Sequence, residues 1–250
     1  TEVAGTSQLL YTTGGVIANS LIPSPVDIDS DGDLAAAIPG DRRDALWLSK
    51  PIVDTVGLEF SESLEFLIPG GENTAVAFLD GRVIVFKERE VRYGIGRPDN
   101  RGLGGPTEFP SVTTDVGAQS WHSVQRIQEG PLAGLIFKSL KGFYLLSRGL
   151  DVSYIGAPVE DYNSETVLSS SLVRDSNQIR FTMSGGDTLV YDYFHDQWAV
   201  FDYNDVPVSA VDWDGTYTHC STSKVLPEST TSFEDDGSAV EASFRTGWLR

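Results

Sequence analysis

The sequence has little of the chemistry that marks common classes of enzyme and metalloprotein. A single cysteine among 250 residues excludes an internal disulfide framework and a cysteine-based zinc site. The three histidines, His122, His195 and His219, stand far from one another in the sequence. Neither a Gly-x-Ser-x-Gly elbow nor a His-Glu-x-x-His pair occurs. We therefore expect a protein that is not an enzyme.

Basic residues and long apolar runs are also scarce. Lysine and arginine number 18 against 36 aspartates and glutamates, which gives a net charge of −18. Proteins that grip nucleic acid need clustered positive charge, so tight binding to DNA, RNA or an anionic membrane is not expected. No run approaches the roughly 18 to 20 apolar residues that a membrane-spanning helix requires. We expect no membrane-spanning segment.

Helical periodicity is almost absent, whereas signals for short antiparallel hairpins recur along the chain. Turn residues such as Asp-Gly and Gly-Gly, which supply positive φ angles, separate pairs of apolar runs. The predicted hairpins are Ala75–Leu79 with Val83–Phe86, Gly134–Ser139 with Phe143–Ser147, Asn177–Met183 with Leu189–Tyr193, and Val208–Trp213 with Tyr217–Ser221.

The residue pattern within these strands predicts how each is covered. Runs such as Val83–Phe86 and Phe143–Leu146 are apolar at successive positions, so both of their faces should be buried. Between Ile179 and Ser184 apolar and polar residues alternate. That alternation predicts one buried face and one solvated face that carries Arg180 and Thr182.

Repeated hairpins favour an all-β fold, a β-propeller of antiparallel blades. A blade needs about 40 to 50 residues, and the hairpin turns recur at uneven intervals of this order. The segment 94–116 is rich in glycine and proline and is predicted to be an inserted surface loop. A β-sandwich is the alternative. The first residue is not methionine and the last residues look like a strand, so we expect 1–250 to be the propeller region of a larger protein.

The densest local motif is Asp27-x-Asp29-x-Asp31, followed by Gly32. Carboxylates at alternate positions before a turn can converge on one Ca²⁺, so Asp27, Asp29 and Asp31 are candidate metal ligands. An EF-hand is excluded because the twelfth position is Ile38 instead of glutamate. A solvated acidic turn between two strands is the favoured explanation of the motif. Among so many carboxylates, pairs with glycosidase-like spacing carry no signal.

Several segments, in the same order along most of the chain, resemble tail proteins of short-tailed bacteriophages. The similarity is to the nozzle or tail tubular protein B-like family, including DNA-stabilising tail proteins. The segments are Leu10–Gly15, Leu46–Lys50, Val85–Glu88, Lys141–Asn163, Asn177–Phe181, Leu189–Tyr193, Gln197–Phe201 and Thr246–Leu249.

This resemblance implies a β-propeller-containing virion protein that forms a ring around the channel through which the genome leaves. Its expected partners are copies of itself, tail adaptor and fibre proteins, and genome DNA that passes without tight binding. The expected location is the virion tail, assembled in the cytoplasm of the bacterial host. The family contributes no catalytic residues and no cofactor, and its members have an ordinary strand and turn where Asp27–Asp33 lies.

The acidic composition has a physical use in such a conduit. A channel lined with carboxylates repels phosphates, so DNA slides instead of adhering. The alternative function is a calcium-dependent glycan-binding β-propeller with Asp27, Asp29 and Asp31 as ligands.

Overall fold

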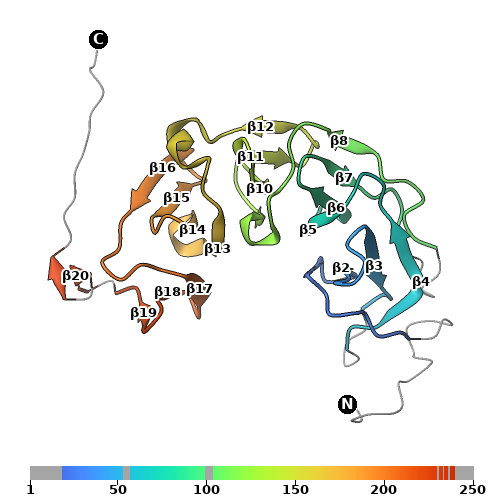
Figure 1. The fold of residues 1–250 in the computed structure, drawn as a ribbon, viewed down its shortest axis with the longest axis horizontal. Coiled ribbons are helices and arrows are strands. Elements are labelled where there is room, and N and C mark those ends of the chain that lie inside the picture. The colour runs from blue at the N-terminus through green and yellow to red at the C-terminus, as the bar shows by residue number, and fades with distance from the viewer. Residues whose placement is uncertain are drawn as a thin grey trace. The chain divides into compact units, whose positions relative to one another are not determined.

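In the part of the chain that the structure describes, the regular secondary structure consists almost entirely of short antiparallel β-strands (Figure 1). The computed structural model describes residues 19–52, 57–98, 104–229, 231–232, 234–235 and 237–239. The chain divides into two compact units, Thr1–Thr166 and Val167–Arg250. In the described residues the only helices are three 3-10 turns, and no helix is long and apolar enough to cross a membrane. These turns are η1 (Trp121–Ser123), η2 (Ala157–Tyr162) and η3 (Arg174–Ser176).

The first unit contains three four-stranded sheets, and in each the strands pair in sequence order. The first sheet comprises β1 (Asp27–Ser30), β2 (Ala35–Ile38), β3 (Ala45–Ser49) and β4 (Phe60–Leu67). The second comprises β5 (Asn73–Leu79), β6 (Arg82–Lys87), β7 (Val91–Tyr93) and β8 (Ser111–Thr113). The third comprises β9 (Gln125–Ile127), β10 (Gly134–Ser139), β11 (Gly142–Ser147) and β12 (Val152–Tyr154).

The second unit contains one further four-stranded sheet, followed by smaller ones. The four-stranded sheet comprises β13 (Val167–Val173), β14 (Gln178–Met183), β15 (Thr188–Asp192) and β16 (Gln197–Phe201). A three-stranded sheet comprises β17 (Ser209–Trp213), β18 (Thr216–Cys220) and β19 (Val225–Pro227). A short hairpin joins β20 (Glu234–Asp235) and β21 (Ser238–Ala239).

The four predicted hairpins are confirmed. In the turn between β5 and β6, Asp80 and Gly81 have φ angles of 49° and 72°. In the turn between β17 and β18, Asp214 and Gly215 have φ angles of 51° and 77°. Positive φ at both central residues is what a two-residue turn needs to follow the twist of its strands. At both positions, Asp-Gly between two apolar runs therefore correctly predicted a two-residue hairpin turn.

The second sheet is the centre of the first unit because both of its faces are buried. Val76 and Phe78 of β5 pack against the first sheet, together with Leu46 and Leu48 of β3. The alternate residues of β5 point the other way and join a cluster that includes Phe86 and residues of the third sheet. This arrangement confirms the prediction that the apolar run Val83–Phe86 is covered on both sides.

The prediction of a solvated face on β14 is wrong. Arg180 and Thr182 have only 4% and 0% of their surface exposed. The reason is tertiary, since Tyr217 of β18 lies over the Arg180 guanidinium, 4.3 Å from its carbon to the ring centroid. Alternation of polarity shows which residues share a face of the strand, but not that a second sheet covers the polar face.

The segment 94–116 also supplies the fourth strand of its sheet. Strand β8 lies within it, and the bridges Ile95–Glu108 and Pro98–Gly104 bring its two arms together. Two of the segments that carry the phage-tail resemblance, Leu10–Gly15 and Thr246–Leu249, lie outside the described residues.

Candidate functional site

A polar junction of the first unit lies where the first strands of its three sheets, β1, β5 and β9, meet. Strand β5 is at the edge of its sheet, so its outward amides have no partner strand. The Asp27 carboxylate accepts a hydrogen bond from the Val76 amide at 2.7 Å. The Asp29 carboxylate accepts one from the Phe78 amide at 2.8 Å. Two carboxylates of β1 thus satisfy the edge amides that another strand would otherwise pair.

The spacing of the two aspartates explains this contact. Residues two apart on a strand point to the same side, and amides two apart on the neighbouring strand do so as well. The sequence pattern Asp-x-Asp therefore matches the repeat of Val76 and Phe78. Ile28, between the two aspartates, is 46% exposed.

Asp31 has a different role, in the turn that follows β1. Its carboxylate accepts hydrogen bonds from the amides of Asp33 and Leu34, at 3.1 and 3.0 Å. The same group forms an ion pair with Arg97 at 3.0 Å. This is the turn-capping geometry that aspartate favours, reinforced by a cation from the segment after β7.

Arg126 of β9 links the three first strands. Its guanidinium donates to the Phe78 carbonyl of β5 at 3.2 Å and to the Ser30 carbonyl of β1 at 3.4 Å. It also lies 3.6 Å from the Asp29 carboxylate. The planar donor fork of arginine suits such divergent oxygen acceptors. Asp29 and Arg126 together fix the relative positions of β1, β5 and β9.

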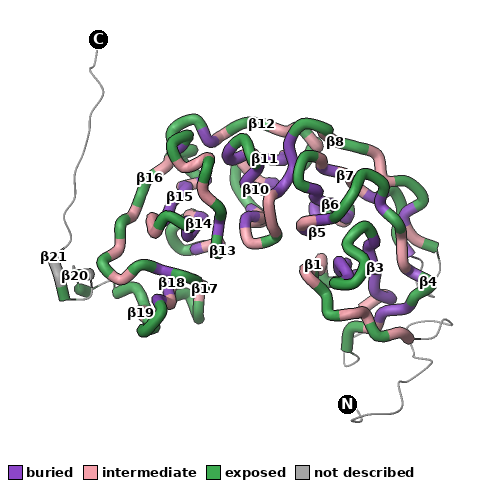
Figure 2. The backbone as a smooth tube through the Cα atoms, in the orientation of Figure 1, coloured by how far each residue is buried: buried purple, intermediate pink, exposed green. Residues whose placement is uncertain are grey.

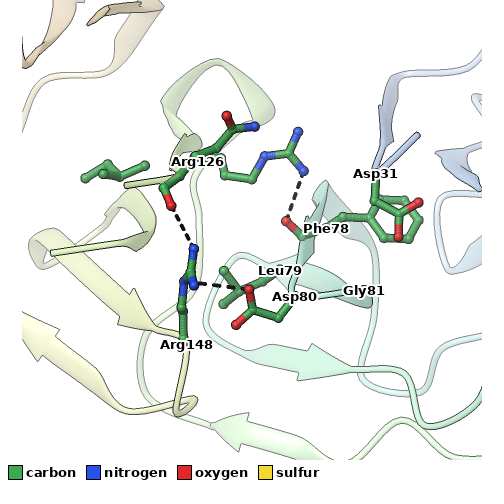
Figure 3. Close-up of a pocket in the computed structure, with 9 residues that line it drawn as sticks. Asp31, Phe78, Leu79, Asp80, Gly81, Arg126 and Arg148 are labelled. Atoms are coloured by element: carbon green, nitrogen blue, oxygen red, sulfur yellow. Dashed lines mark hydrogen bonds and ion pairs between the residues drawn. The ribbon is translucent and has the colours of Figure 1, made fainter. Parts of the chain in front are cut away.

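A small pocket of about 200 Å³ lies beside Arg126 (Figure 3). Arg148 lines it and donates to the Gln128 carbonyl at 2.7 Å, while its Nε lies 3.6 Å from the Asp80 carboxylate. Asp31 also lines the pocket and pairs with Arg97. Each of these arginines thus has an aspartate partner and remains partly exposed to solvent. The pocket is smaller than the 300 to 1,000 Å³ that is usual for small-molecule sites.

Asp27 is the carboxylate whose ionisation this junction perturbs most. Burial raises the pKa of Asp27 to about 6, and the nearby charge of Asp29 acts in the same direction. The hydrogen bonds from the amides of Val76 and Ile28 oppose the rise but do not cancel it. A carboxyl whose pKa is higher in the folded protein binds protons better there, so the unfolding free energy falls as pH rises from about 4 to 6.

Replacing Asp27 by asparagine should therefore stabilise the first unit at neutral pH. The amide oxygen of asparagine can still accept from Val76, but no charge is buried. We expect the unfolding free energy in urea to rise by about 2 kcal/mol at pH 7.5 and to change little at pH 4. The matched control is Asp33→Asn, an exposed position in the turn that follows β1. Equal effects at both pH values, or equal effects of the two substitutions, would contradict this role of Asp27.

The three predicted calcium ligands lie in sequence along β1 and its turn, and their oxygens already accept hydrogen bonds from the protein. Asp27 and Asp29 face β5, whereas Asp31 closes the turn. In the part of the chain that the structure describes, no three aspartate, glutamate, histidine or cysteine side chains are grouped so that they could hold a metal ion. Calcium binding stays a prediction, and a bound ion would have to displace these hydrogen bonds.

The second unit has a similar contact between the first strands of two successive sheets, but a neutral side chain makes it. The Ala210 amide of β17 donates to the Ser169 hydroxyl of β13 at 3.1 Å. As in the first unit, a side chain of one first strand satisfies an edge amide of the next sheet. A carboxylate is therefore not required for this connection, which favours a structural role for Asp27 and Asp29.

Asp192 and His195 form the one histidine–carboxylate ion pair among the described residues. The His195 Nδ1 lies 2.9 Å from one oxygen of Asp192, and the other oxygen accepts from the amides of Phe194 and His195. Burial alone would raise the pKa of Asp192, but these hydrogen bonds lower it overall. The pair closes the exposed turn between β15 and β16.

The longest segment that resembles phage tail proteins, Lys141–Asn163, forms a closed structural element. It contains β11, β12 and η2, and the Asn163 side-chain amide donates back to the Lys141 carbonyl at 3.3 Å. The buried Lys138 ammonium donates to the Asn163 carbonyl at 3.0 Å and to the Gln119 side chain at 3.3 Å. Burial lowers the pKa of Lys138 to about 8. Asn163 thus closes the segment on itself, and Lys138 of β10 holds its last carbonyl.

No model of a protein family matches this chain, and no curated protein matches it either.

Comparison of structures identifies the fold. A chain of the nidogen–laminin complex matches with a TM-score of 0.53 and 7% identity, over 82% of this chain and 75% of that one. The extracellular domain of BT4673 from B. thetaiotaomicron matches with a TM-score of 0.53 and 8% identity. That match covers 83% of this chain but only 27% of the BT4673 chain. These structures are β-propellers, so the predicted β-propeller of antiparallel blades is confirmed and the β-sandwich is not.

Proposed function

We propose that the chain is the propeller region of a non-enzymatic structural protein in the tail of a short-tailed bacteriophage. In this role it is a nozzle-like component of the conduit that retains and delivers the genome. The observation that carries the proposal is the ordered series of segments similar to tail nozzle proteins. Its longest member, Lys141–Asn163, contains β11, β12 and η2, and the Asn163 side chain donates a hydrogen bond to the Lys141 carbonyl.

The use of the polar residues is consistent with a structural role. The aspartates that the sequence offers as metal ligands accept hydrogen bonds from edge amides and turn amides. The arginines around the pocket of the first unit pair with aspartates and backbone carbonyls. These groups hold sheets and turns in place, and a rigid subunit of this kind suits a conduit.

The charge of the protein suits a channel for DNA. A net charge of −18 repels phosphates at short range and offers few cations that could displace their counterions. Genome DNA would then pass the protein without tight binding. Copies of the same chain in a ring, tail adaptor proteins and fibre proteins are the partners that this role requires. The location that follows is the virion tail, after assembly in the host cytoplasm.

Two measurements on the full-length protein test this proposal. Negative-stain electron microscopy and native mass spectrometry should find closed rings of a single stoichiometry. Gel retardation with double-stranded DNA at about 0.15 M salt should find no tight complex. A protein that stays monomeric at all concentrations, or that binds DNA tightly, would contradict the proposal.

A further inference from the structure

The three-stranded sheet of the second unit has two faces of unexpected polarity. The register pairs Val211 of β17 with Thr218 of β18 and Pro227 of β19, so these residues share one face. Tyr217 and His219 of β18 lie on the opposite face. Sheets in soluble proteins usually bury the apolar face and leave the polar face in water.

The buried face of this sheet is the more polar one. Tyr217 and His219 are only 2% and 6% exposed. Tyr217 lies on the Arg180 guanidinium, which is itself 4% exposed and forms an ion pair with Glu228 at 3.0 Å. Arg180, the Tyr217 ring and the Glu228 carboxylate therefore form a polar contact between β14 and this sheet, and the His219 ring centroid lies 4.7 Å from that of Tyr203.

The outward face carries the apolar side chains. Val211 is 48% exposed, Trp213 is 73% exposed and Val225 is 66% exposed. Figure 2 shows these strands largely as exposed and intermediate residues. The register places Trp213 opposite Thr216, and Val225 opposite Cys220, on the same face as Val211. Exposed apolar side chains that lie together on one face of a sheet are typical of a surface that another molecule covers.

The charges around this face indicate the chemistry of the molecule that covers it. Between residues 202 and 229, Lys224 is the single lysine or arginine. Near Trp213, Asp214 occupies the same turn, and an Asp175 oxygen lies 3.8 Å from where a Cβ on Gly215 would be. Asp212, which lies opposite Tyr217, and Glu228, which pairs with Arg180, belong to the buried face, so Asp214 and Asp175 are the carboxylates beside Trp213.

We propose that the outward face of β17–β19 binds a β-strand or β-hairpin of another protein that carries apolar side chains flanked by arginine or lysine. Val211 and Val225 would pack against the apolar side chains. The Trp213 indole would lie against a cation, whose charge Asp214 and Asp175 would balance. Two copies of this face would bring like charges together, so self-association through it is not favoured. Binding at this face is independent of the proposed tail function.

The test uses the whole chain and two synthetic, disulfide-closed β-hairpin peptides. One peptide carries valines on one face and arginines at its rim, and the other has glutamates in place of the arginines. Isothermal titration calorimetry at low salt should find binding of the arginine peptide and at least about tenfold weaker binding of the glutamate peptide. The substitution Trp213→Ser should weaken binding of the arginine peptide about tenfold or more.

Trp121→Ser is the matched control, because Trp121 is also exposed, at 43%, but lies in the first unit. It should leave the affinity unchanged. Because Trp213 is mostly in water, Trp213→Ser should keep the circular dichroism spectrum of the parent. The proposal is overturned if neither peptide binds, if both bind equally, or if Trp121→Ser has the same effect. It is also overturned if sedimentation velocity finds self-association that Trp213→Ser abolishes.

Discussion

Replacing Gly117 by alanine is expected to destabilise the first unit strongly. A Cβ on Gly117 would lie 2.0 Å from the Lys87 carbonyl oxygen and 2.6 Å from the Glu90 nitrogen. Both are backbone atoms at the turn between β6 and β7, so no side chain can move aside. We expect the unfolding free energy to fall by about 3 kcal/mol or more, measured by urea unfolding with circular dichroism.

Gly57→Ala is the control for this experiment. Gly57 has no atom within 4 Å of its hypothetical Cβ, and its φ angle is not in the left-handed region. Its substitution should change stability by less than about 0.5 kcal/mol. A stable Gly117→Ala protein with an unchanged midpoint would show that the segment before η1 does not pack against the β6–β7 turn.

Replacing Arg180 by alanine is expected to have an effect of similar size, located in the second unit. The guanidinium donates to the Gln178 side chain at 3.2 and 3.0 Å and pairs with Glu228. It also lies under the rings of Tyr217 and Phe201, at 4.3 and 5.5 Å. Removing it takes a partner from these groups and opens space between two sheets, so we expect a loss of about 3 kcal/mol.

Hydrogen exchange measures which strands lose stability in Arg180→Ala. The amides of β17 and β18 should lose protection in Arg180→Ala, because the arginine is the centre of their contact with β14. The control is Arg174→Ala in η3, where the side chain is exposed. Uniform loss of protection over the chain, or an equal effect of the control, would contradict the role assigned to Arg180.

The hairpins could be predicted from the sequence because their determinants are local. Asp80-Gly81 and Asp214-Gly215 need only their own backbone angles to make a turn. Burial of Val83–Phe86 on both faces could be predicted for the same reason, because every side chain in the run is apolar. Local chemistry of this kind determines the strands and the all-β fold class.

The contacts between sheets could not be predicted, because they join residues far apart in the sequence. Asp27 and Asp29 show that two carboxylates share a side of a strand, but not that Val76 and Phe78 lie opposite. Arg126 belongs to no recognisable sequence motif, so nothing in the sequence indicates that it links three strands. The alternation around Arg180 predicts solvent, because nothing in its own strand indicates the covering sheet.

The central claim, that this acidic propeller lines a path for DNA, is tested most directly by cryo-electron microscopy of the full-length protein in its assembled form. We predict a closed ring whose channel is lined by carboxylates and is wide enough for a DNA duplex. A channel surface that is neutral or positive, or an assembly without a channel, would contradict the claim.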